Sequence, residues 1–350
     1  MSELQPTVLP VAYMPLIDCA PLVAARRLGL DLEQGIRLDL QRQASWAAVR
    51  DRLLAGQVQA AHALASLVYS IELGVGGPRA PMAVLMTLNQ NGQAITLARP
   101  LAEALRDGQA LPAVLAALGR RARLAQTFPT GTHALWLNYW LAASGVDPRR
   151  EVDMLTIPPP RMPQALEEGL IDGYCCGEPW AALAEAGGYG LRVIRSGNLW
   201  PGHPEKVLAC RRDFAALQPE LAERLCAAVL AACRWLDAAP DNRLRCAQWL
   251  AAPEVIGRPV EQLAACLGEG QAGPQDLVFH DGGRVNLPWL SDGEWFLGQF
   301  QRWGWCELPA DPAALLENVH RLDSYRRAAA RVGVAVPAQA RRPQRLFDQA

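Results

Sequence analysis

Four residues of this sequence have side chains suited to holding a small anion, and the most informative is Lys206. The 34 Lys plus Arg residues comprise this one lysine and 33 arginines. Lysine presents a compact charge, whereas arginine presents a broad planar fork of five donors. Either the single lysine persists by chance on the surface, or a small closed pocket excludes arginine from this position. Prolines and a glycine in the preceding residues, 200–205, fix the backbone and favour the pocket.

The other three candidates, Trp46, Gln93 and His133, lie where loops are expected to lead into helices or strands. Trp46 follows Ser45, whose hydroxyl suits a helix N-cap, and His133 falls in the first turn of an expected helix. Helix N-termini bind anions through their free N–H groups. Each residue also has a simpler role, with Trp46 in the core and His133 as a partly exposed helix residue. Gln93 alone indicates nothing.

Signatures of enzymatic or metal chemistry are weak. The sequence has no serine nucleophile elbow, phosphate-binding glycine loop or zinc-spaced Cys/His group, so we predict no catalytic residue, metal or cofactor. The adjacent Cys175 and Cys176 could form a redox pair, but a disulfide between neighbours is strained, and this favours packing at a strand end. Glu178 suits a cation ligand, a hydrogen-bond acceptor between lobes, or a helix cap.

The bulk composition is that of a globular protein. Hydrophobic residues make up 51% and charged residues 20%, and the net charge of −1 gives no field that would attract nucleic acid or an anionic membrane. No apolar run reaches the ~18 residues of a membrane span. The first basic residue is Arg26, and prolines interrupt the segment before it, so no secretory leader is recognised. Nine scattered cysteines agree with a reducing compartment, and a cytoplasmic location is predicted.

Short apolar segments alternate with helical patterns over the first 200 residues, which is typical of an α/β fold. Strands are expected at residues 7–13, 36–40, 58–63, 82–88, 123–127, 152–156, 173–176 and 191–194. Helices are expected at 21–28, 46–55, 66–74, 101–108, 112–121, 132–143, 163–169, 180–186, 219–236, 242–251, 259–267 and 293–303.

The alternation restarts once, which predicts two lobes. Residues 1–96 and 200–350 are expected to form lobe I, with a helical return at its C-terminal end, and residues 97–199 an inserted lobe II. The chain crosses between them near 93–99 and again near 196–207. Two crossings make a hinge, and a ligand belongs in the cleft between the lobes.

Seven segments, in order and at similar separations, resemble the nitrate/bicarbonate substrate-binding proteins of ABC transporters. They are residues 13–22, 44–51, 60–62, 91–96, 127–140, 173–180 and 200–207. The resemblance runs from about Leu9 to Trp305 and implies a type-II periplasmic-binding-protein fold with a central ligand cleft. It further implies that Trp46, Gln93, His133 and Lys206 hold the anion. One departure is Ala47, where a glycine often follows the tryptophan.

Three functions are compatible with this family. Members without a leader resemble a cytoplasmic nitrate/nitrite sensor that pairs with an antiterminator carrying an RNA-binding ANTAR domain, and so controls nitrate assimilation genes. This sensor is the first expectation, with no direct contact to nucleic acid or membrane. The alternative is the binding component of a nitrate/nitrite or bicarbonate ABC transporter, and the third is an enzyme on the same fold. In each binding role Lys206 is expected to neutralise the anion, within a shell of donors that prefers nitrate and nitrite to bicarbonate.

Overall fold

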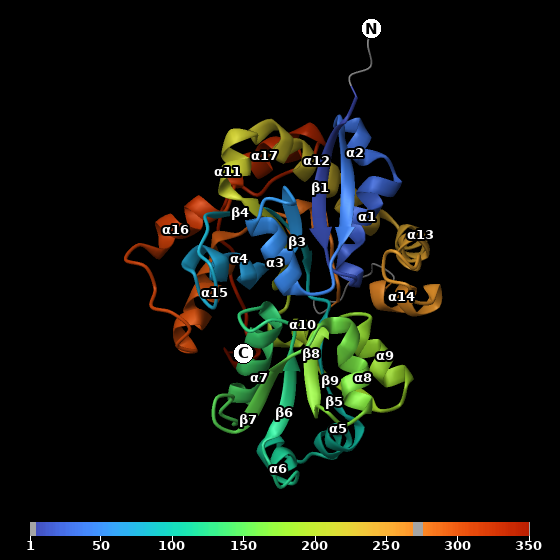
Figure 1. Ribbon diagram of the computed structural model, residues 1–350, viewed down its shortest axis with the longest axis vertical. Helices are drawn as coiled ribbons and strands as arrows, with labels where there is room; N and C mark the ends of the chain where they lie inside the picture. The colour runs from blue at the N-terminus through green and yellow to red at the C-terminus, as the bar shows by residue number, and fades with distance from the viewer. Residues whose placement is uncertain (1–4, 269–275, 350) are drawn as a thin grey trace.

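The computed structural model describes residues 5–268 and 276–349 and forms two α/β lobes, one above the other in Figure 1. Each lobe is built around a five-stranded sheet. The α/β class and the two-lobed fold predicted from the sequence are confirmed. Residues 1–4, 269–275 and 350, which the prediction assigned to lobe I, lie outside the described residues.

The sheet of lobe I has the strand order β2-β1-β3-β10-β4, and the sheet of lobe II the order β7-β6-β8-β5-β9. The strands of lobe I are β1 (Thr7–Tyr13), β2 (Ile36–Arg42), β3 (Ala60–Leu64), β4 (Met82–Gln90) and β10 (Pro204–Arg211). Those of lobe II are β5 (Gln93–Ala98), β6 (Ala122–Gln126), β7 (Val152–Thr156), β8 (Gly173–Gly177) and β9 (Gly190–Arg195).

Helices cover both faces of each sheet. Around the first sheet lie α1 (Ala20–Arg27), α2 (Leu30–Glu33), α3 (Trp46–Leu54), α4 (Ala65–Leu73), α11 (Arg212–Leu217), α12 (Pro219–Ala238), α13 (Pro240–Leu250), α14 (Val260–Leu267), α15 (Leu290–Arg302), α16 (Pro312–Val319) and α17 (Leu322–Arg331). Around the second lie α5 (Arg99–Arg106), α6 (Leu111–Ala116), α7 (Thr132–Ala143), α8 (Met162–Glu167) and α9 (Trp180–Ala186), with α10 (Ser196–Leu199) at the return crossing. Short 3₁₀ turns are η1 (Ile17–Cys19), η2 (Pro159–Arg161), η3 (Asp281–Gly283) and η4 (Phe347–Gln349).

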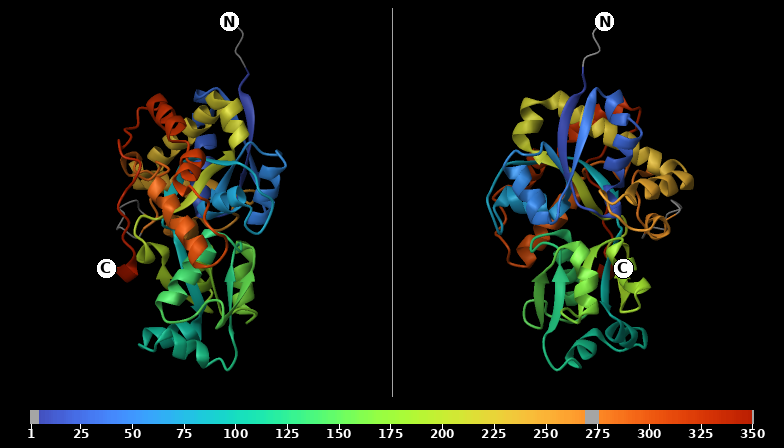
Figure 2. Two further views of the ribbon diagram at one scale, coloured as in Figure 1. Left: turned by 90° about the vertical axis from the view of Figure 1, so that its left-hand side faces the viewer. Right: turned by 45° about the vertical axis from the view of Figure 1, so that its right-hand side comes forward.

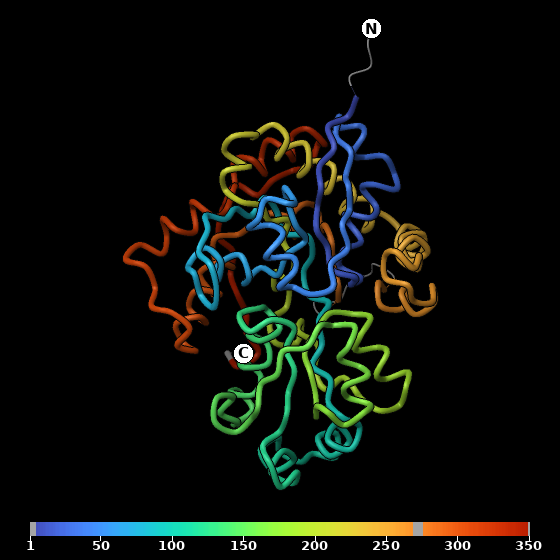
Figure 3. Tube along the Cα trace, in the orientation of Figure 1, coloured from blue at the N-terminus to red at the C-terminus, as the bar shows by residue number. Residues whose placement is uncertain are grey.

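Each sheet contains one strand that enters from the other lobe. Strand β5 follows β4 of lobe I but pairs antiparallel with β8 and β9, and β10 follows lobe II but pairs antiparallel with β3 and β4. The chain therefore changes lobe between Gln90 and Gln93 and again between β9 and β10, as the tube in Figure 3 allows the eye to follow. The predicted division after residue 96 falls inside β5, which pairs along its length with strands of lobe II.

The two crossings are tied to each other. Asn91 adopts a left-handed backbone with φ of 61°, a conformation that asparagine and glycine tolerate best, and Gly92 follows with φ of 88°. The Asn91 side chain accepts a bond from the Gly202 amide at 3.0 Å. Ser196 Oγ accepts a hydrogen bond from the backbone N–H of Gln93 at 3.2 Å and donates one to the backbone carbonyl of Gln93 at 3.2 Å. These bonds hold the two crossings side by side.

The apolar core continues across the junction of the lobes. One cluster of buried residues fills the face of the first sheet under α1, α12 and α13. A second cluster runs from Leu64 and Trp46 in lobe I to Leu124 and Trp136 in lobe II. The C-terminal segment descends from lobe I to the level of the top of lobe II, as the left view of Figure 2 shows. No described helix is long and apolar enough to span a bilayer.

Candidate functional site

Lys206 is fully buried, with an exposed fraction of 0%. It sits on β10 where the pairing with β4 shifts register on both sides of the residue. Such an irregularity re-aims side chains. As a result the Lys206 ammonium contacts the carboxylate of its own neighbour, Glu205, at 3.0 Å, and that of Asp18 at 2.9 Å.

Asp18 reaches the lysine from the 3₁₀ turn η1, which follows β1. Its second oxygen is 2.8 Å from Nε2 of His62 on β3. The His62 Nδ1 accepts a bond from the backbone N–H of Met14 at 3.4 Å, so Nε2 carries the proton and donates to Asp18. Asp18 is thus held between an imidazole and an ammonium.

Gln93 and His133 join the two lobes at the same place. Gln93 begins β5 and His133 is the second residue of α7. The Gln93 Nε2 donates to Asp18 at 3.3 Å, and its Oε1 lies 2.7 Å from His133 Nε2. On the other side of the ring, His133 Nδ1 is 2.6 Å from Thr127 Oγ1. The hinge glutamine therefore links the histidine of lobe II to the aspartate of lobe I.

Glu205 completes the network from the return strand. Its carboxylate accepts bonds from Thr132 Oγ1 and, at 2.9 Å, from Trp136 Nε1, both on α7. The Lys206 ammonium is its third donor, at 3.0 Å. Glu205 thus fastens β10 of lobe I to α7 of lobe II.

Trp46 supplies a donor that has no partner. It is the first residue of α3, where the Ser45 hydroxyl accepts a bond from the Ala48 amide at 3.2 Å, so Ser45 is the N-cap, as the sequence predicts. The Trp46 ring centroid is 5.6 Å from the Lys206 ammonium. Within residues 5–268 and 276–349, nothing accepts a hydrogen bond from the buried Trp46 indole N–H. A buried orphan donor is costly and indicates a place for an acceptor.

The two lobes contact each other directly around this network. Gly177 at the end of β8 faces Gln93 and Asp18 so closely that an added Cβ would lie 2.7 Å from Gln93 Oε1. The backbone N–H of Ile17 in lobe I donates to the Glu178 carbonyl of lobe II at 3.0 Å. The Glu178 carboxylate instead accepts from the Ala182 amide, so Glu178 serves both as acceptor between the lobes and as a cap.

Burial and charge set the protonation states. Burial opposes the charge of both Asp18 and Lys206, yet each holds the other charged: the pKa of Asp18 lies below and that of Lys206 above its usual value. Burial lowers the pKa of His133 to about 3 and that of His203 to about 3, and it also lowers the pKa of His62. All three rings are therefore neutral near pH 7.

The structure brings together all four residues predicted to bind an anion, Trp46, Gln93, His133 and Lys206. Their contact with a ligand stays a prediction. The expected shell of donors alone is wrong, because Asp18 and Glu205 add two carboxylates that neutralise the lysine from within. Both lie inside segments that carried the family resemblance, but nothing in a linear sequence indicated that they would face Lys206.

Comparison with known proteins shows the family to which this chain belongs. A model of the NMT1-like family matches residues 2–251. The chain belongs to the NMT1-like family. In this family it is 33% identical over 350 residues to the nitrate/nitrite binding protein NrtA of Synechococcus elongatus, covering 92% of this chain and 77% of that protein. The crystal structure of the periplasmic nitrate-binding protein NrtA from Synechocystis PCC 6803 superposes with a TM-score of 0.91 at 29% identity, covering 99% and 95% of the two chains.

Two longer relatives contain a similar region. The nitrate import ATP-binding protein NrtC of Synechococcus elongatus is 36% identical over 97% of this chain, and the bicarbonate transport ATP-binding protein CmpC of Synechocystis sp. is 33% identical over 97% of it. This chain spans about half of each, 52% of their length. The NMT1-like chain is therefore similar to substrate-binding proteins and to one part of two transport ATP-binding proteins.

The cysteine pair and possible metal ligands of this NMT1-like chain can be judged from their burial and arrangement. Cys175 and Cys176 are buried on β8, and burial raises the pKa of both thiols well above its usual value, which leaves them as unreactive core residues. Among the described residues no group of three or more His, Cys, Asp or Glu has an arrangement that could hold a metal ion.

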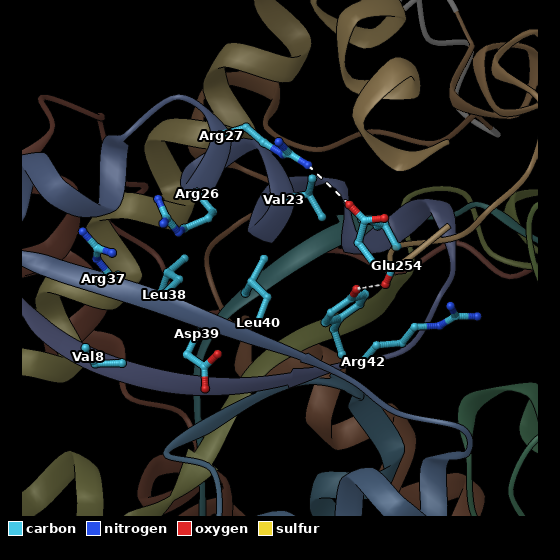
Figure 4. A pocket seen from close by; sticks show the side chains of 12 residues that line it. Val8, Val23, Arg26, Arg27, Arg37, Leu38, Asp39, Leu40, Arg42 and Glu254 are labelled. Atoms are coloured by element: carbon cyan, nitrogen blue, oxygen red, sulfur yellow. Dashed lines mark hydrogen bonds and ion pairs between the residues drawn. The ribbon is translucent and has the colours of Figure 1, made fainter. Parts of the chain in front are cut away.

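A separate groove lies on the outer side of lobe I, between α1 and the edge strand β2 (Figure 4). Its volume is about 710 Å³, and Arg26, Arg27, Arg37 and Arg42 stand around an apolar floor that includes Leu40. It shares no residue with the buried network around Lys206. The groove opens to solvent, whereas the network is closed between the lobes.

Proposed function

We propose that this chain is the substrate-binding component of an ABC import system for nitrate or nitrite. The similarity to NrtA over most of both chains supports this role. The similarity to one half of NrtC, a nitrate import ATP-binding protein, points the same way. On this proposal the protein binds and releases its ligand without chemical change, and Trp46, Gln93, His133 and Lys206 contact it.

One observation carries the proposal: at the closed junction of two lobes, the fully buried Lys206 ammonium lies 5.6 Å from the ring centroid of Trp46, whose buried indole N–H has no partner among the described residues. On this proposal an oxyanion accepts from both groups, and Trp46 and His133 place it near the first turns of α3 and α7. Those turns carry free N–H groups and the positive end of the helix dipole. A small planar anion with three or two oxygens matches this set of donors.

The transport role is favoured over the sensor that the sequence first suggested. NrtA and NrtC are named as binding and import proteins, and neither supports an antiterminator carrying an ANTAR domain as partner. Cytoplasmic location likewise stays a prediction. Fractionation of cells with an antibody to the protein separates the two roles: recovery outside the cytoplasmic membrane supports transport. Co-purification with an antiterminator that nitrate abolishes would instead support the sensor.

Bicarbonate is a second candidate ligand, because Asp18 and Glu205 are acceptors. Bicarbonate carries a hydroxyl that donates a hydrogen bond, which nitrate and nitrite lack at neutral pH. The similarity to CmpC adds to this alternative. Calorimetric titration with nitrate, nitrite and bicarbonate at one pH ranks the three ligands directly.

Trp46→Phe gives the sharpest test of the site. The substitution removes an N–H that bonds to nothing else among the described residues, so folding is expected to be unaffected while the ligand loses one bond. A bond to a charged acceptor contributes about 1.5–3 kcal/mol, so the nitrate Kd is expected to rise about tenfold to over a hundredfold. The control is Trp303→Phe, whose buried N–H is also unpartnered but lies at the end of α15. Equal nitrate affinity in wild type and Trp46→Phe would contradict the proposed site.

A further inference from the structure

The buried network carries a net negative charge before any ligand enters. One ammonium, Lys206, contacts two carboxylates, Asp18 and Glu205, and the exposed fraction of all three is 1% or less. The neighbouring rings of His62, His133 and His203 are neutral. The formal sum is therefore −1, and Lys206 is already neutralised by Asp18 at 2.9 Å.

A second negative charge in this site has a large electrostatic cost. Two unit charges 4 Å apart interact by about 4 kcal/mol at an effective dielectric constant of 20. An anion that contacts Lys206 lies within similar reach of both carboxylates, because each carboxylate touches the same ammonium. The lysine alone cannot compensate all three anions, and the closed lobes keep water from screening them.

We propose that the anion binds together with one proton, which is taken up by His133, and that Asp18 and Glu205 enforce this coupling. The inference rests on the proposed function, since it concerns nitrate or nitrite at the same site. With the proton the network and its ligand return to a net charge of −1, the value that the closed protein already accommodates. Asp18 and Glu205 thereby become determinants of specificity.

His133 is the ring best placed to receive the proton. Its Nδ1 faces the Thr127 hydroxyl at 2.6 Å, and a hydroxyl accepts as readily as it donates, so protonation turns this bond around without losing it. Its Nε2 lies 2.7 Å from Gln93 Oε1 and 3.6 Å from Glu205 Oε1, where a positive ring is stabilised. The charged and titratable groups that face it are Glu205 and Lys206 on β10, Asp18 on η1 and His203 before β10.

The other two rings are less suited. Asp18 at 2.8 Å favours a charged His62, but protonation of this ring would remove the acceptor of the Met14 backbone N–H. His203 already donates from Nδ1 to the Pro204 carbonyl and is disfavoured as a cation by Lys206 and Arg342. Because burial holds the pKa of His133 at about 3 in the unliganded protein, the ring is unprotonated at pH 7, and a proton that it carries at that pH must come with the anion.

Calorimetry of the intact chain counts the proton. Nitrate is titrated at pH 7 in buffers with small and large ionisation enthalpies, and the dependence of the observed heat on the buffer gives the protons taken up. We expect about one per nitrate, and the nitrate Kd to rise about tenfold per unit from pH 6 to pH 8, which is the linkage for one proton. Nitrate binding with no buffer dependence and a flat pH profile would overturn the inference while leaving the proposed function intact. Absence of binding by nitrate and nitrite would overturn the function itself.

Two variants locate the coupling. Asp18→Asn brings the unliganded network to a formal charge of zero, so proton uptake is expected to fall below one half and the nitrate Kd at pH 8 to fall about tenfold. Asp31→Asn is the matched control, a buried aspartate on α2 that does not contact the network, and wild-type uptake is expected. His133→Gln should abolish uptake and weaken binding. Full uptake in His133→Gln would contradict the assignment to this ring, and the wild-type titration decides the coupling even where a variant does not fold.

Discussion

At the scale of single residues, the chain shows how composition alone can point to a site. Lys206 is conspicuous because arginine fills every other Lys or Arg position, and the fold gives the physical reason. Its ammonium fits between Asp18 and Glu205 in a place with no exposed surface. A planar guanidinium needs more room and presents its donors in a fixed fork.

Substitutions at Lys206 are expected to separate charge from size. Lys206→Ala leaves two buried carboxylates without their counter-ion, which costs about 3–5 kcal/mol of unfolding free energy. Lys206→Arg keeps the charge but overfills the site, with a typical overpacking cost of about 1–3 kcal/mol. Chemical denaturation measures the unfolding free energy, and calorimetry should find nitrate binding impaired in both variants. An arginine variant with wild-type stability and nitrate affinity would show that the pocket does not select for lysine.

The sequence could predict the residues expected to face the anion, but not the two carboxylates that contact Lys206. Trp46, Gln93 and His133 stand at recognisable junctions between elements, where N-caps and turns give local signals. Asp18 and Glu205 carry no local signal, because acidic residues are common on any surface. Only the three-dimensional arrangement of η1 and β10 reveals that both are buried against one ammonium.

At the scale of elements, sequence patterns predict best those helices and strands whose boundaries depend on neighbouring residues in the chain. Strand β1 and helices α7 and α9 begin and end where the periodicity places them. The sequence predicts only crossings where β5 and β10 lie, because these strands pair with partners that are distant in sequence, β5 with β8 and β10 with β3. The helical return extends further than predicted, with α16 and α17 following α15.

The contact between β10 and α7 is expected to govern closure of the lobes. Glu205 accepts from Thr132 and Trp136 of lobe II while it contacts Lys206 of lobe I. Glu205→Ala removes these bonds, so the ligand-free protein should shift toward an open state, seen as a larger radius of gyration in small-angle X-ray scattering. Glu72→Ala, which removes a buried carboxylate paired with Arg212 within lobe I, is the control. An unchanged radius in Glu205→Ala would show that other contacts hold the lobes closed.

At the scale of the whole molecule, the histidines form a common pattern. The chain has five, at positions 62, 133, 203, 280 and 320, and every one is buried with its pKa lowered by burial. The pKa is about 3 for His133 and His203 and about 4 for His320. In the unfolded chain each ring has a pKa of about 6.5. In mild acid the unfolded state therefore binds protons that the folded state does not bind.

This difference predicts that the folded protein is sensitive to mild acid. Stability from these rings is fully present above pH 6.5 and is lost as the pH falls toward the folded pKa values. Each ring contributes a slope of up to about 1.4 kcal/mol per pH unit, so His133, His203 and His320 together contribute about 4 kcal/mol per unit near pH 5. Chemical denaturation at pH 7.5, 6 and 5 measures the slope. His320→Gln, which replaces a ring bonded to Tyr69 and the Pro288 carbonyl, should reduce the slope by up to about 1.4 kcal/mol per pH unit. A free energy of unfolding that stays constant from pH 7.5 to 5 would mean that the folded protein opens to protonate these rings.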